Sequence, residues 1–448
     1  MTADSMTADP GRPVALPAPL QLWGGVEGSV VRVGDAWRDQ VRETGHQDRI
    51  GDLDRIAALG IRTLRYPVLW ERCAEGPAWC GWAWHDERMG RLRALGIAPI
   101  AGLVHHGSGP PGRDSLDAGW AEGLAEHAAL AAARYPWVLD WTPVNEPLTT
   151  ARFAALYGFW HPHAATEAAF EAMVFIQCRA VLLCMRAIRE RIPDARLVQT
   201  EDLGRTFSTP LLAYQAAYEN ERRWLSLDLL CGRVDRSHPA WDHFAALGFP
   251  PAWIDEFRGG GAAPNLLGIN HYVTSDRFLD HRTSLYAPRL RGGNSRDAYV
   301  DTEAARMDLP APLTGWEARL REAWQRYGRP MAVTEAHLAC VDEAESVRWL
   351  AEAWAAAHAL RAEGADIRAV TAWSLFGAVD WDSMLRQSRG HYEVGVWDAR
   401  AHPPRPARLA AAMASLAQTG RCDDPALAQA GWWRRDDRFH EAARRAQR

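Results

Sequence analysis

An α/β fold built around a parallel sheet is predicted by three observations on this sequence. Eight short apolar runs recur along the chain, most of them ending in polar or turn-forming residues. Between most of these runs, apolar residues recur at helical spacing, so strands and helices alternate. The chain also has 448 residues, of which 48% are hydrophobic, and this is enough to bury one large core. Strands that alternate with helices pair in parallel, because each helix carries the chain back to the start of the next strand.

The number of predicted strands specifies the architecture further. They lie at residues 20–27, 61–66, 97–104, 138–145, 196–200, 266–270, 331–334 and 367–373. The predicted helices include a long one at 166–191 and a closing one at 405–416. Gly60 and Gly96 are each expected to end a helix, since glycine readily takes the left-handed conformation after a last helical turn. Eight such units close into a TIM-type (β/α)8 barrel.

The barrel is predicted to be a single domain at residues 20–419. A flexible segment precedes it at 1–19, and a tail follows at 420–448 that either packs on the barrel or leads towards a partner. Residues 205–261 show helical patterns and no obvious strand, and residues 277–313 are rich in Arg, Gly and Asp. We expect both stretches as inserts on the face at which the strands end, where such barrels hold their active sites.

Charge and composition exclude several classes of function. The net charge is −5, with 51 basic and 56 acidic residues mixed along the chain and no basic stripe for a nucleic acid. The N-terminus lacks the basic start and apolar centre of a secretory signal, and no run approaches the ~18 apolar residues of a membrane span. The seven cysteines are scattered, which is typical of reduced thiols. We therefore predict a cytoplasmic protein with no nucleic-acid or membrane partner, and an oligomer is possible.

Polar side chains stand at the ends of nearly all the predicted strands. In a barrel these ends converge on one site, so the residues are candidates for a shared function. If the chain only had to turn at these positions, Gly, Asn, Asp and Ser would be favoured over Glu, Arg, His and Trp. The candidates are Glu27, Arg65, His105, His106, Asn145, Glu146, Glu201, Asp202, Asn270, His271, Tyr272, Glu335 and Trp373.

Two of these residues are glutamates at the end of an apolar run, Glu146 in Val-Asn-Glu-Pro and Glu335 in Val-Thr-Glu-Ala. Two carboxyl groups are the minimum equipment for cleaving a glycosidic bond with retention of configuration. One acts as general acid and then as base, and the other is the nucleophile. For a retaining reaction the two carboxyl groups should lie about 5–5.5 Å apart.

The chain resembles glycoside hydrolase family 1, the β-glucosidase-type retaining glycosidases on (β/α)8 barrels. Thr-Pro-Val-Asn-Glu-Pro at 142–147 is similar to the family's acid/base motif, and Val-Thr-Glu at 333–335 to its nucleophile motif. Other similar segments are Gly-Ile-Asn-His-Tyr at 268–272, the second strand from 64 to 70, Trp-Ser-Leu at 373–375 and Asp-Trp at 380–381. The resemblance runs in order from about residue 20 to residue 416.

The resemblance implies roles for the matching residues. Glu146 would be the acid/base, so its pKa should be raised by apolar surroundings and by the second carboxylate. Glu335 would be the ionised nucleophile, with the positive charge of Arg65 beside it and a hydrogen bond from Tyr272. Asn145 is placed to bind the sugar 2-hydroxyl. Further substrate contacts are implied for His105, Trp373 and Trp381, and Trp70 offers another flat apolar face.

Several positions depart from the family pattern, and they bear on which sugar is bound. Asp380 stands where the family has a glutamate, and His106 where it has a tryptophan. Glu27 can partly substitute for a family glutamine, and Glu201 with Asp202 can bind a hydroxyl or amino group of a different sugar. The predicted substrate is therefore a small-molecule glycoside or oligosaccharide with a β-glycosidic bond, whose sugar and aglycone stay open.

Three alternatives to a retaining β-glycosidase remain. A transglycosidase would use the same two glutamates and pass the sugar to an acceptor other than water. A catalytically silent sugar-binding or scaffold protein would fit the divergence in the last motif. A metal-dependent hydrolase would use His105 and His106 with His271 and His337, although Arg65 in the same pocket opposes a cation. For the favoured reaction we expect neither a cofactor nor a metal.

Overall fold

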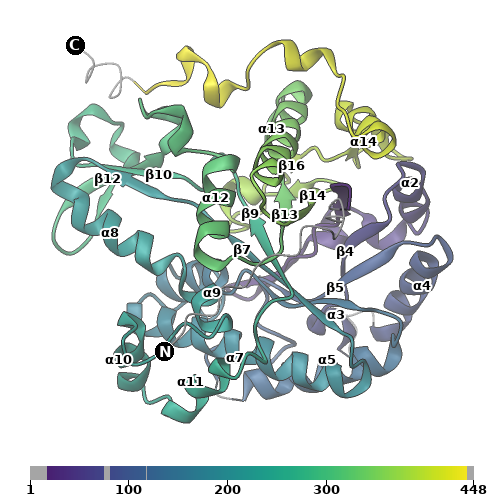
Figure 1. Cartoon of the computed structure of the whole chain (residues 1–448), viewed down its shortest axis with the longest axis horizontal. Helices are drawn as coiled ribbons and strands as arrows, with labels where there is room; N and C mark the ends of the chain where they lie inside the picture. Colours follow the sequence, from purple (N-terminus) through teal and green to yellow (C-terminus); the bar gives the residue numbers. More distant parts are fainter. Residues whose placement is uncertain (1–17, 75–80, 118, 441–448) are drawn as a thin grey trace, which may run out of the picture.

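The computed structural model describes residues 18–74, 81–117 and 119–440 (Figure 1). The segment predicted to be flexible at 1–19 lies outside these ranges apart from Ala18 and Pro19, and so do the last eight residues of the tail, 441–448. Cys80 is likewise outside the described residues.

Eight strands form a closed barrel in the order β1-β14-β13-β9-β7-β6-β5-β4. Every pair of neighbouring strands is parallel. The strands are β1 (Gln21–Gly25), β4 (Thr63–Pro67), β5 (Ala98–His105), β6 (Asp140–Asn145), β7 (Arg196–Asp202), β9 (Leu266–Asn270), β13 (Met331–Ala336) and β14 (Ile367–Ala372). The predicted (β/α)8 barrel is therefore confirmed, and all eight predicted strands are present.

The strands are apolar because both of their faces are buried. All six residues of β13 are buried, for example. Inside the barrel, one residue from each of six strands meets in a buried cluster that is separate from the main core: Trp23, Ile100, Val198, Leu266, Ala332 and Ala369. Side chains thus fill the interior, and the carboxyl ends of the strands are left to form a site.

Helices cover the outside of the barrel (Figure 1). They are α2 (Asp52–Ala58), α4 (Gly81–Ala94), α5 (Trp120–Arg134), α7 (Glu167–Arg191), α12 (Trp316–Tyr327), α13 (Glu343–Ala362) and α14 (Arg408–Thr419). The long helix α7 begins where predicted, because the Thr166 hydroxyl caps it by accepting a hydrogen bond from the Ala169 N–H. By length and composition α7 could cross a membrane, but 72% of its most apolar window is buried. It packs against α5, as a core helix does.

The two predicted inserts lie at the ends of β7 and β9. The first contains four helices, α8 (Ala213–Arg222), α9 (Leu225–Leu230), α10 (Pro239–Ala246) and α11 (Pro251–Arg258). The second contains β10 (Arg277–Asp280), β11 (Arg291–Gly293) and β12 (Ala298–Glu303). The first also holds a strand that the sequence did not reveal, β8 (Thr206–Ser208), which is too short to show an alternating pattern. It pairs with β10 in a four-stranded sheet of order β11-β12-β10-β8.

Residues 420–440 of the tail pack on the barrel. The Trp433 indole is buried, contacts Trp349 of α13 edge-on and donates a hydrogen bond to Glu352 at 2.7 Å. Three 3-10 turns carry the chain along this side: η9 (Pro425–Ala428), η10 (Trp432–Arg434) and η11 (Asp436–Arg438). The described part of the tail therefore packs on the barrel, which is one of the two alternatives that the sequence left open. Figure 1 shows it as the yellow segment along the top of the molecule.

The remaining short elements connect these layers. They are β2 (Val30–Val33), β3 (Ala36–Asp39), α1 (Gln40–Glu43), α3 (Trp70–Cys73), α6 (Pro147–Ala151), β15 (Ala378–Val379), β16 (Tyr392–Glu393), β17 (Trp397–Asp398) and β18 (Arg405–Pro406). Both α6 and the β15–β16 hairpin contribute to the site described next.

Candidate active site

A cavity of about 580 Å³ opens at the carboxyl ends of the barrel strands. Residues at the ends of β5, β7 and β13, and residues that follow β1, β6, β9 and β14, line its wall. Nine of the side chains predicted for the site are among them: Glu27, His105, His106, Glu146, Asp202, Tyr272, Glu335, Trp373 and Trp381. The structure therefore gathers most of the predicted candidates in one place.

Glu335 is held by two donors at the end of β13. One Arg65 Nη donates to its Oε1 at 2.7 Å, and the Tyr272 hydroxyl donates to its Oε2. A cation and a hydroxyl donor both stabilise the negative charge of this carboxylate. Burial and the nearby charge of Glu335 raise the pKa of Tyr272 well above its usual value, so the phenol keeps the proton that it donates. Each oxygen of the Glu335 carboxyl group therefore faces a donor, and one of the two donors is a cation.

Glu146 is the first residue after β6 and has a left-handed backbone, with φ of +47°. This conformation is strained for a side chain that is not glycine, and such strain is often stored at functional sites. Its Oε1 accepts a hydrogen bond from the Asn270 amide at 2.6 Å, and its Oε2 lies 3.6 Å from Nε2 of His106. Burial first, and then the negative charges of Glu335 and Asp202, raise the pKa of Glu146 well above its usual value. Glu146 is therefore equipped to hold a proton.

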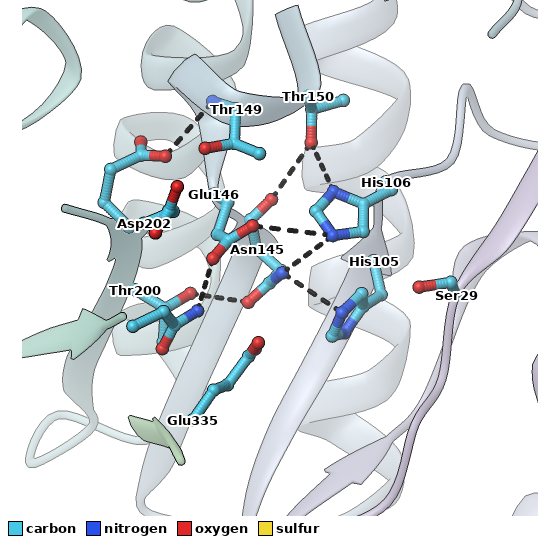
Figure 2. Close-up of polar contacts among 12 residues, drawn as sticks. Ser29, His105, His106, Asn145, Glu146, Thr149, Thr150, Thr200, Asp202 and Glu335 are labelled. Atoms are coloured by element: carbon cyan, nitrogen blue, oxygen red, sulfur yellow. Dashed lines mark hydrogen bonds and ion pairs between the residues drawn. The ribbon is translucent and has the colours of Figure 1, made fainter. Parts of the chain in front are cut away.

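Asn145 and Arg65 lie beneath the cavity rather than in its wall, and both line a small adjacent hollow. The Asn145 Oδ1 accepts from Arg65 at 2.7 Å and from the Thr200 hydroxyl at 2.7 Å. Its Nδ2 lies 3.1 Å from Nε2 of His105 and 3.5 Å from Nε2 of His106 (Figure 2). Burial lowers the pKa of both histidines, so their neutral rings can accept from this amide. Asn145 thus connects Arg65, which binds Glu335, with His106, which lies beside Glu146.

Glu27 lines the same cavity, and among the described residues only the His105 ring, at 4.0 Å, lies within ion-pair distance of its carboxyl group. Its Oε1 accepts hydrogen bonds from the backbone N–H and the hydroxyl of Ser29, and Trp373 Nε1 lies 3.3 Å from its Oε2. Burial is the main cause that raises the pKa of Glu27 to about 7. The carboxyl group is therefore available, in either protonation state, to bind a hydroxyl of a ligand.

His337, considered from the sequence only as a possible metal ligand, forms a pair with Glu393 that lies beside Trp373 and also lines the cavity. His337 Nδ1 faces the Trp373 carbonyl at 3.0 Å, and its Nε2 lies 3.1 Å from Glu393. Burial alone would lower the pKa of His337, but the hydrogen bond and charge of Glu393, the Trp373 carbonyl and the charge of Glu27 together outweigh burial, so the pKa is raised. Glu393 belongs to the β15–β16 hairpin, not to a barrel strand, so no strand-end pattern pointed to it.

Two predicted substrate-binding residues do not reach the cavity, and these predictions are corrected. The Asp380 carboxylate accepts hydrogen bonds from three backbone N–H groups, those of residues 389, 390 and 391, and from Arg38. Glu201 accepts from the N–H groups of Leu148 and Thr149 and from the Ser226 hydroxyl. Side chains alternate along a strand, so Glu201 points away from the cavity and Asp202 points into it.

His271 and Trp70 also lie away from the cavity. His271 is buried among Trp316 and Trp349, and its Nδ1 donates to a backbone carbonyl at 2.9 Å. Trp70 packs against Trp120, with ring centroids 6.0 Å apart, and does not line the cavity. Within residues 18–74, 81–117 and 119–440, no three His, Cys, Asp or Glu side chains form a group that could hold a metal ion.

These features define a class: a (β/α)8 barrel that presents two glutamates, one with a raised pKa and one held by a cation, from the ends of β6 and β13 in one cavity. Figure 2 shows Glu335 directed towards the group that contains Asn145 and Glu146.

Solved structures of β-glucosidases share this fold. No protein-family model matches the chain. A family 1 β-glucosidase from Thermotoga maritima aligns with a TM-score of 0.67 and 16% identity, over 89% of this chain and 98% of that one. A β-glucosidase from Thermotoga maritima in complex with deoxynojirimycin aligns with a TM-score of 0.67 and 15% identity, over 89% and 98%. One in complex with glucoimidazole aligns with a TM-score of 0.68 and 16% identity, over 88% and 97%. At this identity, the likeness establishes the shared (β/α)8 fold.

Proposed function

We propose that this protein is a retaining β-glycosidase of the β-glucosidase type, a divergent member of glycoside hydrolase family 1. The observation that carries the proposal is the contrast between two glutamates in one cavity. Glu146 has a strongly raised pKa, and Glu335 is bound by Arg65 and Tyr272. A protonated and an ionised carboxyl group at one site are what double displacement requires.

In the first step, the Glu335 carboxylate attacks the anomeric carbon while the bond to the leaving oxygen breaks. Glu146 gives its proton to that oxygen, so the aglycone departs as a neutral alcohol or phenol. The sugar is then held as an ester on Glu335. The loss of the negative charge on Glu335 removes one of the causes that raise the pKa of Glu146, which favours its ionised form. Glu146 then takes a proton from water as the water oxygen attacks the anomeric carbon and releases Glu335.

The structural neighbours support a sugar-derived substrate. The Thermotoga maritima β-glucosidases are seen in complexes with small molecules such as deoxynojirimycin and glucoimidazole. By analogy, we propose a small-molecule β-glycoside as the substrate of this protein. The cytoplasmic location predicted from composition stays a proposal, which cell fractionation would test.

Covalent trapping tests the proposed reaction. A 2-deoxy-2-fluoro β-glycosyl donor with a good leaving group should glycosylate the enzyme and release the sugar only slowly, and peptide mass spectrometry should find the sugar on Glu335. Glu335→Ala should remove the label and lower kcat by at least about a thousandfold, as loss of a nucleophile does in other enzymes. Glu71→Gln is a matched control, because Glu71 is a fully buried glutamate outside the cavity.

The control variant should keep the label. If none of a panel of fluorinated gluco-, galacto- and mannosyl donors labels the wild-type protein, the double-displacement proposal is wrong. If the label appears on another residue, the nucleophile assignment is wrong while a covalent mechanism stands.

A further inference from the structure

Arg152 stands in the cavity wall with unused hydrogen-bonding capacity. It begins η2 (Arg152–Leu156), a single π-helical turn that directly follows α6. Its Nε is buried and has no hydrogen-bond partner among the described residues. Its ion pair with Asp202 spans 3.7 Å, which is longer than a hydrogen bond. Buried polar groups are normally bonded, so an open guanidinium in a cavity indicates a missing partner.

Other charged side chains of the outer wall have closer partners. Arg277 donates to Asp301 at 2.8 Å, Arg223 pairs with Glu322 at 2.9 Å, Asp382 pairs with Arg389, and Glu219 accepts from the Thr206 hydroxyl at 2.9 Å. Arg222, which pairs with Glu167 only at 3.7 Å, adds a further positive charge to the wall. The carboxylate that faces Arg152, Asp202, already accepts a hydrogen bond from the Ser275 hydroxyl. The guanidinium of Arg152 can therefore bind a further anion.

An aromatic wall adjoins this arginine. Phe153 and Tyr157 line the same cavity, and their ring centroids are 6.1 Å apart. The Tyr157 side chain is 44% exposed, which is high for a ring in a folded protein, so one part of it is free for contact. Flat aromatic faces bind planar ligand rings through offset or edge-on stacking.

The position of this wall relative to Glu146 identifies the part of a substrate that would meet it. Arg152 is close enough to Glu146 for their charges to interact, and Glu146 is the group that protonates the leaving oxygen in the proposed reaction. The charge of Glu27 interacts instead with that of Glu335, Trp373 contacts Glu27, and His337 faces the Trp373 carbonyl. The arginine and the two rings that follow it in sequence are thus assigned to the Glu146 side of the cavity, where the leaving group departs.

We infer that the aglycone is a planar aromatic acid, whose ring packs on Tyr157 and Phe153 and whose carboxylate binds Arg152. The planar guanidinium suits this role because it can meet a carboxylate with two parallel N–H donors. This inference rests on the proposed glycosidase function and narrows its substrate class to β-glycosides of phenolic acids. No covalent step is added to the mechanism.

Two matched substrates test the inference by kinetics. The wild-type enzyme should have a higher kcat/KM for 4-carboxyphenyl β-glucoside than for 4-carbamoylphenyl β-glucoside, although the carboxylate makes the poorer leaving group. Arg152→Gln should lower this ratio about tenfold or more, because charged hydrogen bonds contribute ~1.5–3 kcal/mol. Arg277→Gln, which removes a charge already paired with Asp301, should leave the ratio unchanged. Arg152→Lys should restore part of it.

A binding measurement keeps the test independent of hydrolysis. Isothermal calorimetry should show that 4-hydroxybenzoate binds the wild-type protein more tightly than 4-hydroxybenzamide, and that Arg152→Gln removes the difference. Circular dichroism checks that each variant is folded. If both ligands bind equally well to the wild-type protein, the inference is overturned, even where both glycosides are hydrolysed. If 4-hydroxybenzoate binds selectively but Glu335 is never labelled, the proposed glycosidase function fails while the anion site stands.

Discussion

At the scale of single residues, the site depends on a series of contacts that gives Glu146 and Glu335 different electrostatic surroundings. Arg65 contacts Glu335 and Asn145, and Asn145 contacts His106, which lies beside Glu146. The positive charge in this series of contacts is that of Arg65, which lies beside the proposed nucleophile, Glu335. Glu146 instead accepts from the neutral Asn270 amide and lies beside the His106 imidazole. The more distant charge of Arg152 does not offset burial and the nearby negative charges, so the pKa of Glu146 is raised.

This arrangement predicts a shift in the pKa of Glu146 when the charge of Glu335 is removed. In Glu335→Gln, burial still raises the pKa of Glu146, but repulsion by the neighbouring anion is lost. The pKa of Glu146 should therefore be lower than in the wild-type protein, yet still above its usual range. Carboxyl ¹³C NMR of glutamate-labelled protein, with Glu146→Gln to assign the signal, measures both values. An unchanged pKa would show that the two groups are not coupled.

At the scale of elements, the position of Glu146 depends on the start of α6. Glu201, from β7, accepts the N–H groups of Leu148 and Thr149 in the first turn of that helix. A carboxyl group in this place satisfies donors that have no partner within the helix. The residue that the sequence suggested as a sugar ligand therefore acts on the helix that follows the acid/base glutamate.

Two capping variants separate this role from stability alone. Glu201→Ala should lower the free energy of unfolding by about 1–2 kcal/mol, and it should also lower kcat because Glu146 is no longer held in place. Thr166→Ala removes the cap of α7, away from the cavity, and should destabilise by a similar amount with kcat preserved. Urea denaturation and assays on an aryl β-glycoside give the two quantities. Equal kcat values for the two variants would contradict the positioning role.

At the scale of the whole molecule, the sequence predicts what depends on regular repetition. Buried parallel strands are apolar and helices are amphipathic, so eight repeats of this alternation determined the barrel and the face that carries Glu146 and Glu335. The direction in which a side chain points at the end of a strand is harder to predict from the sequence, as Glu201 and Asp202 show. Irregular loops are harder still, because Asp380 and Glu393 are positioned by hairpin backbone contacts that leave no periodic pattern.

The tail gives a prediction for the stability of the whole barrel. Trp433 is 4% exposed, contacts Trp349 and bonds to Glu352, and so connects residues 420–440 to α13. Trp433→Ala should lower the free energy of unfolding by about 3–5 kcal/mol, since truncation of a buried large aromatic leaves a cavity as well as lost contacts. Trp432→Ala, at the partly buried neighbour, should have a smaller effect. Urea denaturation followed by circular dichroism measures both. Equal and small losses would mean that the tail is held by its ion pairs instead, such as the one between Arg434 and Glu352.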